Sequence, residues 1–377
     1  MKSTVYFASL CAFAPSFVRC AGSGNPWTDA TTFLTPQYAE KVTAAVANMT
    51  NTTLQVQAAL VAKVPTFFWM DTADKVSNFS DILKLASMEK DTPQVVQAVI
   101  YDLPDRDCSA NASAGEFSIA DDGATKYKAY IDSIAAEVNQ YPDVRIVFVV
   151  EPDGLANLVT NLDVPKCTGA NSTYREVIAY AISNLQQSNV WLYLDAGHSG
   201  WLGWPANLSP AATLFSAVLN ATTNNATIQG FATDVSNYNQ LRGDVADPAQ
   251  GTNPNYNEER YINALIPLLQ QNGVPTQFIV DQGRSGRIDL RGSEAEWCNI
   301  NGAGLGLRPT TDTGNTAIDS IVWVKPPGDS DGTSDPSSTR FDSHCALNTS
   351  VQPAPEAGVW FQSYFEMLVE NANPPLS

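Results

Sequence analysis

Apolar runs rich in β-branched residues recur along the chain, and stretches with a helical spacing of apolar positions separate most of them. Each run is nearly continuous instead of alternating with polar positions, which is typical of strands buried on both faces of a parallel sheet. The pattern predicts seven strands, at Thr66–Met70, Val95–Leu103, Val144–Val150, Val190–Leu194, Ile228–Thr233, Thr276–Val280 and Ser320–Val324.

Two of the intervening stretches predict amphipathic helices most clearly. Residues Tyr127–Val138 read YKAYIDSIAAEV, in which apolar positions lie three and four residues apart. Residues Trp360–Glu370 predict a final helix near the end of the chain. Because strands alternate with helices, we predict an α/β fold in which the parallel strands form a β/α barrel.

Charged and aromatic residues follow the carboxyl ends of all seven predicted strands. An Asp that caps the next helix explains one or two of these positions, but not seven in succession. In a β/α barrel these strand ends meet at one rim, where active sites are built. The rim residues are Trp69, Asp71, Tyr101, Asp102, Asp105, Arg106, Asp107, Glu151, Asp153, Asp195, His198, Asp234, Asp281, Arg284, Lys325, Asp329 and Asp331.

Composition narrows the class of partner. The 377 residues carry a net charge of −18, so the surface repels nucleic acid phosphates and anionic lipid, and we expect neither as a partner. Only 16% of residues are charged, while 8 Trp, 13 Tyr and 15 Phe offer flat faces that suit sugar rings. A given Trp is still more often core than ligand contact, by about two to one.

The first 21 residues read as a secretory signal peptide. Lys2 precedes an apolar run from Val5 to Phe13, and small residues follow near Ala21. The run is too short to span a membrane. Residues 22–377 contain no Ser/Thr/Pro-rich linker and no second module, so we expect a secreted, monomeric protein with a single domain.

Four cysteines remain outside the predicted signal peptide, at Cys108, Cys167, Cys298 and Cys345. An even number in a secreted chain predicts two disulfides, and no spacing fits a zinc or redox motif. Three connectivities are possible, of which the simplest pairs neighbours along the sequence. Secretion is also supported by Asn-x-Ser/Thr glycosylation sequons, at Asn48, Asn51, Asn78, Asn111, Asn171, Asn207, Asn220, Asn225 and Asn348.

Six stretches of this chain closely resemble the signature segments of glycoside hydrolase family 6, the fungal cellobiohydrolase II family. They are YDLPDRDC (101–108), VVEPDGLAN (149–157), DAGHSGWLGWPAN (195–207), DQGRSG (281–286), WVKPPGDSDGTSD (323–335) and RFDSHCAL (340–347). The resemblance runs from about Gly22 to the end, and makes residues 22–377 one catalytic domain without a cellulose-binding module. It implies a distorted, TIM-like barrel of seven parallel strands with an active-site tunnel at their carboxyl ends.

The same resemblance implies the chemistry. Members of this family hydrolyse β-1,4-glucan with inversion at the anomeric carbon, and the cellobiohydrolases among them release cellobiose from non-reducing ends without a metal or cofactor. Inversion needs a protonated carboxyl on one side of the bond and an activated water on the other.

The resemblance also distributes catalytic roles. Asp153 matches the general acid, and Asp107 matches the carboxylate that raises the pKa of that acid by like-charge repulsion. Asp331 matches the proposed base, although the water proton in this family also has a route through Ser113 and Asp107. Tyr101 matches the residue that helps to distort the sugar at the cleavage point.

Further positions match the family's substrate contacts. Sugar-stacking tryptophans are expected at Trp69, Trp201, Trp204 and Trp297, and polar contacts at Asp71, His198, Asn237, Arg284, Lys325 and Asp329. One departure is visible, because this chain has Asp329-Ser330 where close relatives usually have Glu-Cys. Asp329 is one methylene shorter than Glu, so we expect a weaker hydrogen bond to substrate there.

Three alternatives remain at this level. The first is an endoglucanase on the same fold, but the segment after Cys108 and the stretch Lys325–Cys345 look long enough to roof a tunnel, which favours exo action. The second is an inactive glucan-binding protein, which would not need the acids at 107, 153 and 331. The third is a metal-dependent hydrolase, because rim carboxylates also bind Mg²⁺ or Mn²⁺.

Overall fold

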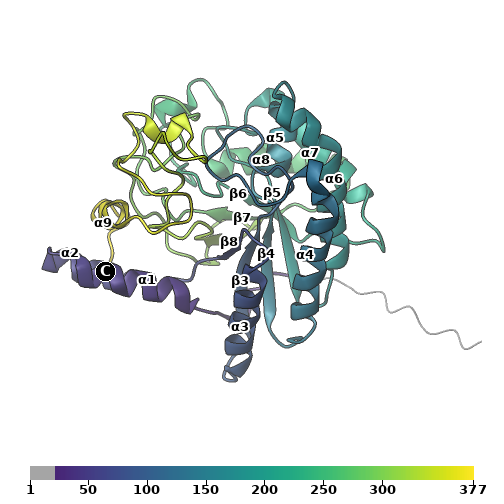
Figure 1. Cartoon of the computed structure of the whole chain (residues 1–377), viewed down its shortest axis with the longest axis horizontal. Coiled ribbons are helices and arrows are strands. Elements are labelled where there is room, and N and C mark those ends of the chain that lie inside the picture. Colours follow the sequence, from purple (N-terminus) through teal and green to yellow (C-terminus); the bar gives the residue numbers. More distant parts are fainter. Residues whose placement is uncertain (1–21) are drawn as a thin grey trace, which may run out of the picture.

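The computed structural model describes residues 22–377, and the predicted signal peptide lies outside the described residues. Parallel strands form the centre of the molecule (Figure 1). Their bounds are β1 Thr31–Thr32, β2 Phe68–Met70, β3 Gln94–Ile100, β4 Arg145–Val150, β5 Val190–Asp195, β6 Gly230–Thr233, β7 Gln277–Asp281 and β8 Ile318–Val322.

The strands follow the order β3-β4-β5-β6-β7-β8, and β1 and β2 both pair with the free edge of β3. Strand β1 pairs with the start of β3, Thr31 opposite Gln94, and β2 with its end, Met70 opposite Ile100. Within residues 22–377 no ladder joins β8 to β2, and one backbone hydrogen bond of 3.3 Å from Phe67 to Trp323 spans the seam. The predicted parallel α/β barrel is confirmed as a half-barrel of seven strands, to which β1 adds a short edge strand.

Alternate residues of each strand face two different layers. Val95, Val99, Val147 and Val149 point into the barrel, where they pack with Tyr193 and other side chains from neighbouring strands. The residues between them join the larger core under the helices, as Val96, Ala98, Ile100, Ile146 and Phe148 show. Because both layers are buried, the strands read as continuous apolar runs.

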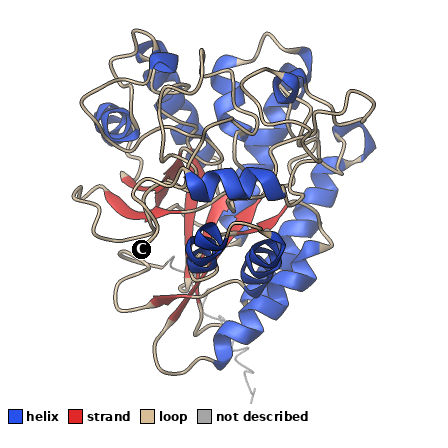
Figure 2. Cartoon of the chain, turned by 90° about the vertical axis from the view of Figure 1, so that its left-hand side faces the viewer, coloured by secondary structure: helices blue, strands red, loops and turns tan. Residues whose placement is uncertain are grey.

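Helices cover the barrel on its outside, and the loops at the carboxyl ends of the strands gather at one end of it (Figure 2). The helices are α1 Pro36–Asn48, α2 Thr52–Val61, α3 Lys75–Met88, α4 Gly123–Val138, α5 Gly154–Thr160, α6 Pro165–Asn184, α7 Pro205–Asn220, α8 Glu258–Gln271 and α9 Gln362–Glu370. None of the helices in this part of the chain is long and apolar enough to cross a membrane.

Both helices predicted from the sequence are present, with shifted starts. Helix α4 begins four residues before Tyr127, because Asp122 turns the chain with a left-handed φ of 53° directly before it. Helix α9 begins at Gln362, since Phe361 is still extended. Helices α1, α2 and α9 form a second apolar cluster of their own, beside Trp323 at the end of β8.

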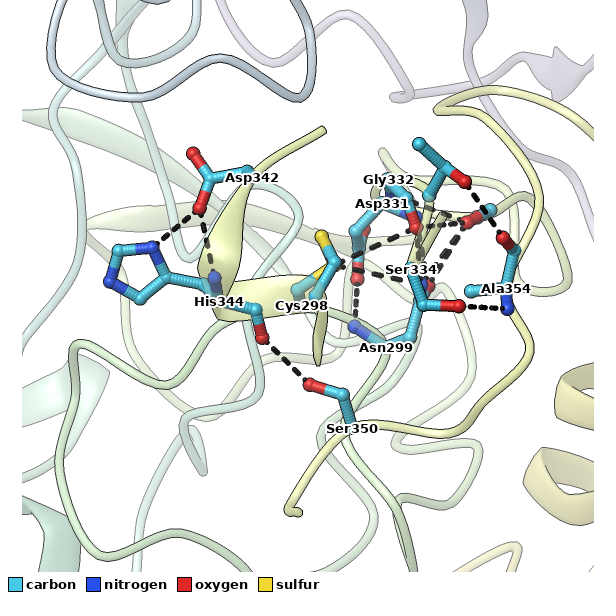
Figure 3. The surroundings of a disulfide bond; sticks show 12 residues. Cys298, Asn299, Asp331, Gly332, Ser334, Asp342, His344, Ser350 and Ala354 are labelled. Carbon is cyan, nitrogen blue, oxygen red and sulfur yellow. Dashed lines mark hydrogen bonds and ion pairs between the residues drawn. A yellow bond between two sulfur atoms is a disulfide. The ribbon is translucent and has the colours of Figure 1, made fainter. Parts of the chain in front are cut away.

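Two disulfides tie the long loops down. Cys108 bonds to Cys167 and joins the segment after β3 to α6, while Cys298 bonds to Cys345 and joins the loops on either side of β8 (Figure 3). Of the three possible connectivities, the structure therefore has the pairing of sequence neighbours.

Candidate active site

A cavity of about 830 Å³ lies at the carboxyl ends of the strands. Thirteen of the fifteen residues to which the sequence analysis assigned catalytic or substrate-binding roles line it. They are Trp69, Asp71, Tyr101, Asp107, Ser113, Asp153, His198, Trp201, Asn237, Trp297, Lys325, Asp329 and Asp331. Residues separated by more than 250 positions therefore meet in one hollow, as expected for the rim of a barrel.

The other two residues do not line the cavity. Trp204 lies directly before α7, where its indole N–H donates to the carbonyl of Gly200 at 3.0 Å. Arg284 is 1% exposed and pairs with Asp331, so its guanidinium supports a cavity residue from behind. The predicted direct substrate contacts of these two residues stay predictions.

Left-handed backbone conformations mark the rim. Asp107, Glu151, Asp153, Asp234 and Ser236 have φ values between 49° and 66°, although none is glycine. Such residues are energetically unfavourable and cluster at functional sites, where the surrounding structure holds them. Here they turn the chain sharply just beyond β3, β4 and β6.

Asp153 occupies the position directly before α5, yet its side chain does not cap that helix. Its backbone N–H donates to Asp195 at 3.0 Å, while within residues 22–377 its carboxyl has no hydrogen-bond partner. Burial raises the pKa of Asp153 well above its usual value, the charges of Asp195 and Asp107 raise it further, and Lys325 opposes them in part. These surroundings favour the protonated form of the Asp153 carboxyl, which lines the cavity.

Asp195 is a neighbour of Asp153 to which the sequence analysis gave no role. Burial raises the pKa of Asp195 to about 7, against the opposing effect of hydrogen bonds from the backbone N–H groups of Gly197 and Asp153. Its position at the end of β5 was visible in the sequence, but its contact with a residue of the previous rim loop was not.

Asp107, Ser113 and Tyr101 form a short hydrogen-bonded chain. One oxygen of Asp107 accepts from the backbone N–H of Ser113 at 2.8 Å and from its hydroxyl at 3.0 Å. The hydroxyl of Ser113 also lies 3.2 Å from that of Tyr101. The three groups therefore form one continuous hydrogen-bonded series between the cavity and the carboxyl of Asp107.

Arg106 contacts Tyr101 and Ser113 instead of pairing with Asp107. Its guanidinium lies 4.3 Å from the centre of the Tyr101 ring and donates to the carbonyl of Ser113 at 2.7 Å. It also donates to the carbonyl of Tyr101, and its closest carboxylate is Asp102 at 3.4 Å. Within the described residues, Arg106 therefore makes no salt bridge to Asp107.

Asp331 lies in the opposite electrostatic environment from Asp153. Arg284 donates to both of its oxygens at 2.7 and 2.8 Å, and Tyr238 and the backbone N–H of Asn299 each donate at 2.8 Å. Burial opposes ionisation, but Arg284 and then Lys325 outweigh it and hold the pKa of Asp331 below its usual value. Asp331 is a stable carboxylate whose oxygens are already occupied by donors.

Three tryptophans line different parts of the cavity. Trp69 donates its indole N–H to the carbonyl of Val324 at 2.9 Å and meets the Tyr101 ring edge to face, with centres 5.3 Å apart. Trp201 donates to Thr160 at 2.7 Å. Trp297 lies beside His344, with ring centres 5.6 Å apart. The indole N–H groups of Trp69 and Trp201 are bonded to protein, so these two side chains are held in place with flat apolar surfaces of the kind that suits sugar rings.

His198 is a neutral hydrogen-bonding group. Burial and then the charge of Arg291 lower its pKa to about 3, so the imidazole is uncharged near neutral pH. Its Nδ1 accepts from the amide of Asn239 at 2.9 Å, which leaves the proton on Nε2. Glu294 lines the cavity beside it and pairs with Arg291 at 2.8 Å.

Lys41 is a cavity residue that the sequence analysis missed. It reaches the cavity from α1 and donates to both oxygens of Asp329, at 2.8 and 3.0 Å. The two residues are 288 positions apart, and no motif around Lys41 indicates the contact. The Asp329 carboxyl, which we expect to contact substrate, therefore already has a protein partner.

Comparison with known proteins fits this geometry. The family model described as glycosyl hydrolases family 6 matches residues 27–372. The chain belongs to glycosyl hydrolase family 6. The resemblance seen in its six motifs is thereby confirmed over nearly the whole described chain.

Individual family 6 proteins are similar along most of their length. Exoglucanase 3 of Agaricus bisporus is 55% identical over 356 residues, which are 94% of this chain and 81% of that protein. The CcCel6A catalytic domain complexed with p-nitrophenyl β-D-cellotrioside has a TM-score of 0.92 and 51% identity, over 94% of this chain and 99% of that chain. Cellobiohydrolase II (Cel6A) from Humicola insolens, in complex with glucose and cellotetraose, has a TM-score of 0.90 and 46% identity, over 93% and 100%.

Proposed function

We propose that this family 6 hydrolase is a secreted cellobiohydrolase, which releases cellobiose from the non-reducing ends of β-1,4-glucan with inversion. The names of its relatives support the activity and the substrate, and two disulfides support secretion. The observation that carries the mechanism is the carboxyl of Asp153, which lines the cavity without a hydrogen-bond partner among the described residues and has a raised pKa.

In the proposed reaction, Asp153 donates its proton to the glycosidic oxygen as the bond to the anomeric carbon breaks. A water molecule attacks that carbon from the opposite face of the ring. Its proton passes to the hydroxyl of Ser113, which in turn gives its own proton to Asp107. Tyr101 and Trp69 hold the sugar ring at the cleavage point.

Asp331 fits the role of general base less well than Ser113 and Asp107 do. A base needs a free lone pair and a pKa near the working pH. The oxygens of Asp331 accept from Arg284, Tyr238 and Asn299, and its pKa is lowered. We propose that Asp331 stabilises positive charge that develops on the sugar and keeps Lys325 oriented toward the cavity.

Exo action is favoured over endo action because loops on both sides of the cavity contribute to its lining. Ser109 and Ala110 belong to the loop after Cys108, while Arg340 and His344 belong to the stretch that follows β8. A roofed cavity admits a chain end more readily than the middle of a chain.

The mechanism is tested by following the anomeric proton signals of cellotetraose hydrolysis by NMR. Inversion of a β-linkage releases the α-anomer first, whereas initial release of the β-anomer would contradict the proposal. Asp153→Asn should lower kcat by a factor of about 10³ or more and still bind cellotetraose. Asp105→Asn, on the same rim but outside the cavity lining, should retain activity.

Exo and endo action are separated by the products from soluble β-glucan. Cellobiohydrolase action gives cellobiose with a slow loss of viscosity, whereas rapid loss of viscosity would support the endoglucanase alternative. Sedimentation of the secreted enzyme tests the expected monomer, and N-terminal sequencing tests the cleavage near residue 21.

A further inference from the structure

The loop that carries Ser113 reaches across the cavity to the loop on the other side. Ser109, Ala110 and Ser113 line the cavity from the segment after Cys108. Arg340 and His344 line it from the segment that follows β8. We call residues 109–123 the acid-side loop and residues 334–350 the disulfide loop.

Asn111 makes every hydrogen bond between these two loops within residues 22–377. Its side-chain amide donates to the carbonyls of Thr339 at 2.9 Å and Phe341 at 3.2 Å. Its backbone N–H donates to one carboxylate oxygen of Asp342 at 2.9 Å. One residue thus satisfies three acceptors of the opposite loop.

The disulfide loop is arranged to receive these donors. The other oxygen of Asp342 accepts from the backbone N–H of His344 at 3.0 Å and lies 2.6 Å from its Nδ1 (Figure 3). Asp342 is 8% exposed and His344 stands beside Trp297, so the carboxylate is fixed whether or not Asn111 is present.

The next residue, Ala112, adds an apolar contact. Ala112 is fully buried and packs against the disulfide between Cys298 and Cys345. The fit is close, because a Cβ added to Gly332 would lie 2.7 Å from both Ala112 and Cys345. The methyl group of Ala112 therefore fills a small space between Gly332 and the disulfide, which we call the socket. The hydrogen bonds of Asn111 hold Ala112 in that position.

We propose that Asn111 is the latch of the active-site roof, a positioning residue that closes the cavity and holds the hydroxyl of Ser113 against Asp107. Ser113 lies two residues beyond Asn111, and its hydroxyl is 3.0 Å from Asp107. Arg106 holds the carbonyl of Ser113, and the backbone N–H of Ser113 donates to Asp107 at 2.8 Å, but neither contact joins this loop to the opposite one. The inference rests on the proposed hydrolysis, because it assigns Ser113 to the path of the water proton.

The test compares Asn111→Ala and Asn111→Asp with Asn348→Ala, all made as the full catalytic domain in a host that does not attach N-glycans. Asn348 is a suitable control, because it is an exposed sequon asparagine on the disulfide loop and makes no hydrogen bond to the acid-side loop. Asn111→Ala removes both side-chain bonds, and Asn111→Asp also places a carboxylate against two carbonyls and near Asp342.

We expect the loss of viscosity per reducing end formed on soluble β-glucan to rise at least threefold in Asn111→Ala and further in Asn111→Asp. On cellotetraose, kcat should fall severalfold while KM changes less than twofold. The midpoint of thermal unfolding should stay close to that of Asn348→Ala, since a merely destabilised fold would not produce this pattern.

Wild-type behaviour of both Asn111 variants would overturn the latch. So would an equal change in Asn348→Ala, because the effect would then not depend on contact between the loops. Failure of the proposed function is a different result, in which the wild type and the control also fail to cleave cellotetraose with inversion.

Discussion

Two carboxyl groups of the same cavity are held in opposite protonation states. Burial together with the charges of Asp195 and Asp107 keeps the pKa of Asp153 high. Arg284 and Lys325 overcome burial at Asp331 and keep its pKa low. Neighbouring groups whose environments separate their pKa values are the usual basis for assigning an acid and a carboxylate in one site.

This arrangement predicts a pH effect at Asp107. Removing its charge with Asp107→Asn lowers the pKa of Asp153, so the acid loses its proton at a lower pH. The alkaline limb of kcat/KM against pH should therefore move to lower pH, beside a loss of rate from the broken contact with Ser113. Asp105→Asn is the matched control and should keep the wild-type limb, and an unshifted limb in Asp107→Asn would contradict the coupling.

The ion pair between Arg284 and Asp331 predicts a stability effect. Arg284 is 1% exposed, so Asp331→Asn leaves a buried guanidinium without its anion. Breaking a buried pair in this way costs about 3–5 kcal/mol. Urea unfolding should show this decrease, whereas exposed Asp143→Asn should change the free energy of unfolding by less than about 0.5 kcal/mol. A small effect at Asp331 would contradict the dependence of the buried Arg284 guanidinium on this carboxylate.

The sequence predicted those site residues that lie in motifs at the ends of strands. The carboxyl ends of parallel strands meet at one rim of the barrel, and this does not depend on the conformation of the loops. It did not predict Lys41, which reaches Asp329 from a helix near the start of the chain. It also placed Arg284 at the substrate, since the residue type alone does not say whether a guanidinium faces the cavity or a neighbouring carboxylate.

At the scale of elements, the presence of the strands was predicted better than their first and last residues. The run Val95–Leu103 is longer than β3, because the chain leaves the sheet at Tyr101 and its carbonyl accepts from Arg106. Strand β1 was missed because two residues carry no periodic pattern, and pairing with β3 alone defines it. Tertiary contacts of this kind leave no local signal.

Removing the disulfide between Cys298 and Cys345 should change both the free energy of unfolding and the closure of the cavity. Replacing both cysteines by Ser releases a closure of 47 residues, which the chain-entropy model values at about 4 kcal/mol. The socket of Ala112 should loosen as well, so exo products should decrease. Replacing Cys108 and Cys167 by Ser should cost a similar amount, about 4 kcal/mol, without opening that socket. Equal product patterns for the two double variants would contradict the distinction.

At the scale of the whole molecule, buried carboxyls favour stability in acid. Burial raises the pKa values of Glu151, Asp195 and Glu258 to about 7. In the unfolded chain such groups titrate at about 4, so the folded state binds more protons between these values. The stability they contribute is complete below about pH 4 and is lost as the pH rises through 7.

The midpoint of thermal unfolding should therefore fall between pH 5 and pH 8, and the net charge of −18 adds to the decline. Differential scanning calorimetry across this range measures the slope. Glu151→Gln should make the slope shallower, because one titrating group is removed. A midpoint that rises with pH would show that these carboxyls are ionised in the folded enzyme.

The amide nitrogen of Asn111 has a second possible fate, because Asn111, Ala112 and Ser113 form an Asn-x-Ser sequon. An oligosaccharide on that nitrogen replaces one of its two hydrogens, so it no longer serves both Thr339 and Phe341. Enzyme carrying a glycan there should cut internal bonds more often than bare enzyme of identical sequence. The cell that produces this cellulase would then help to set where along a glucan chain it cuts.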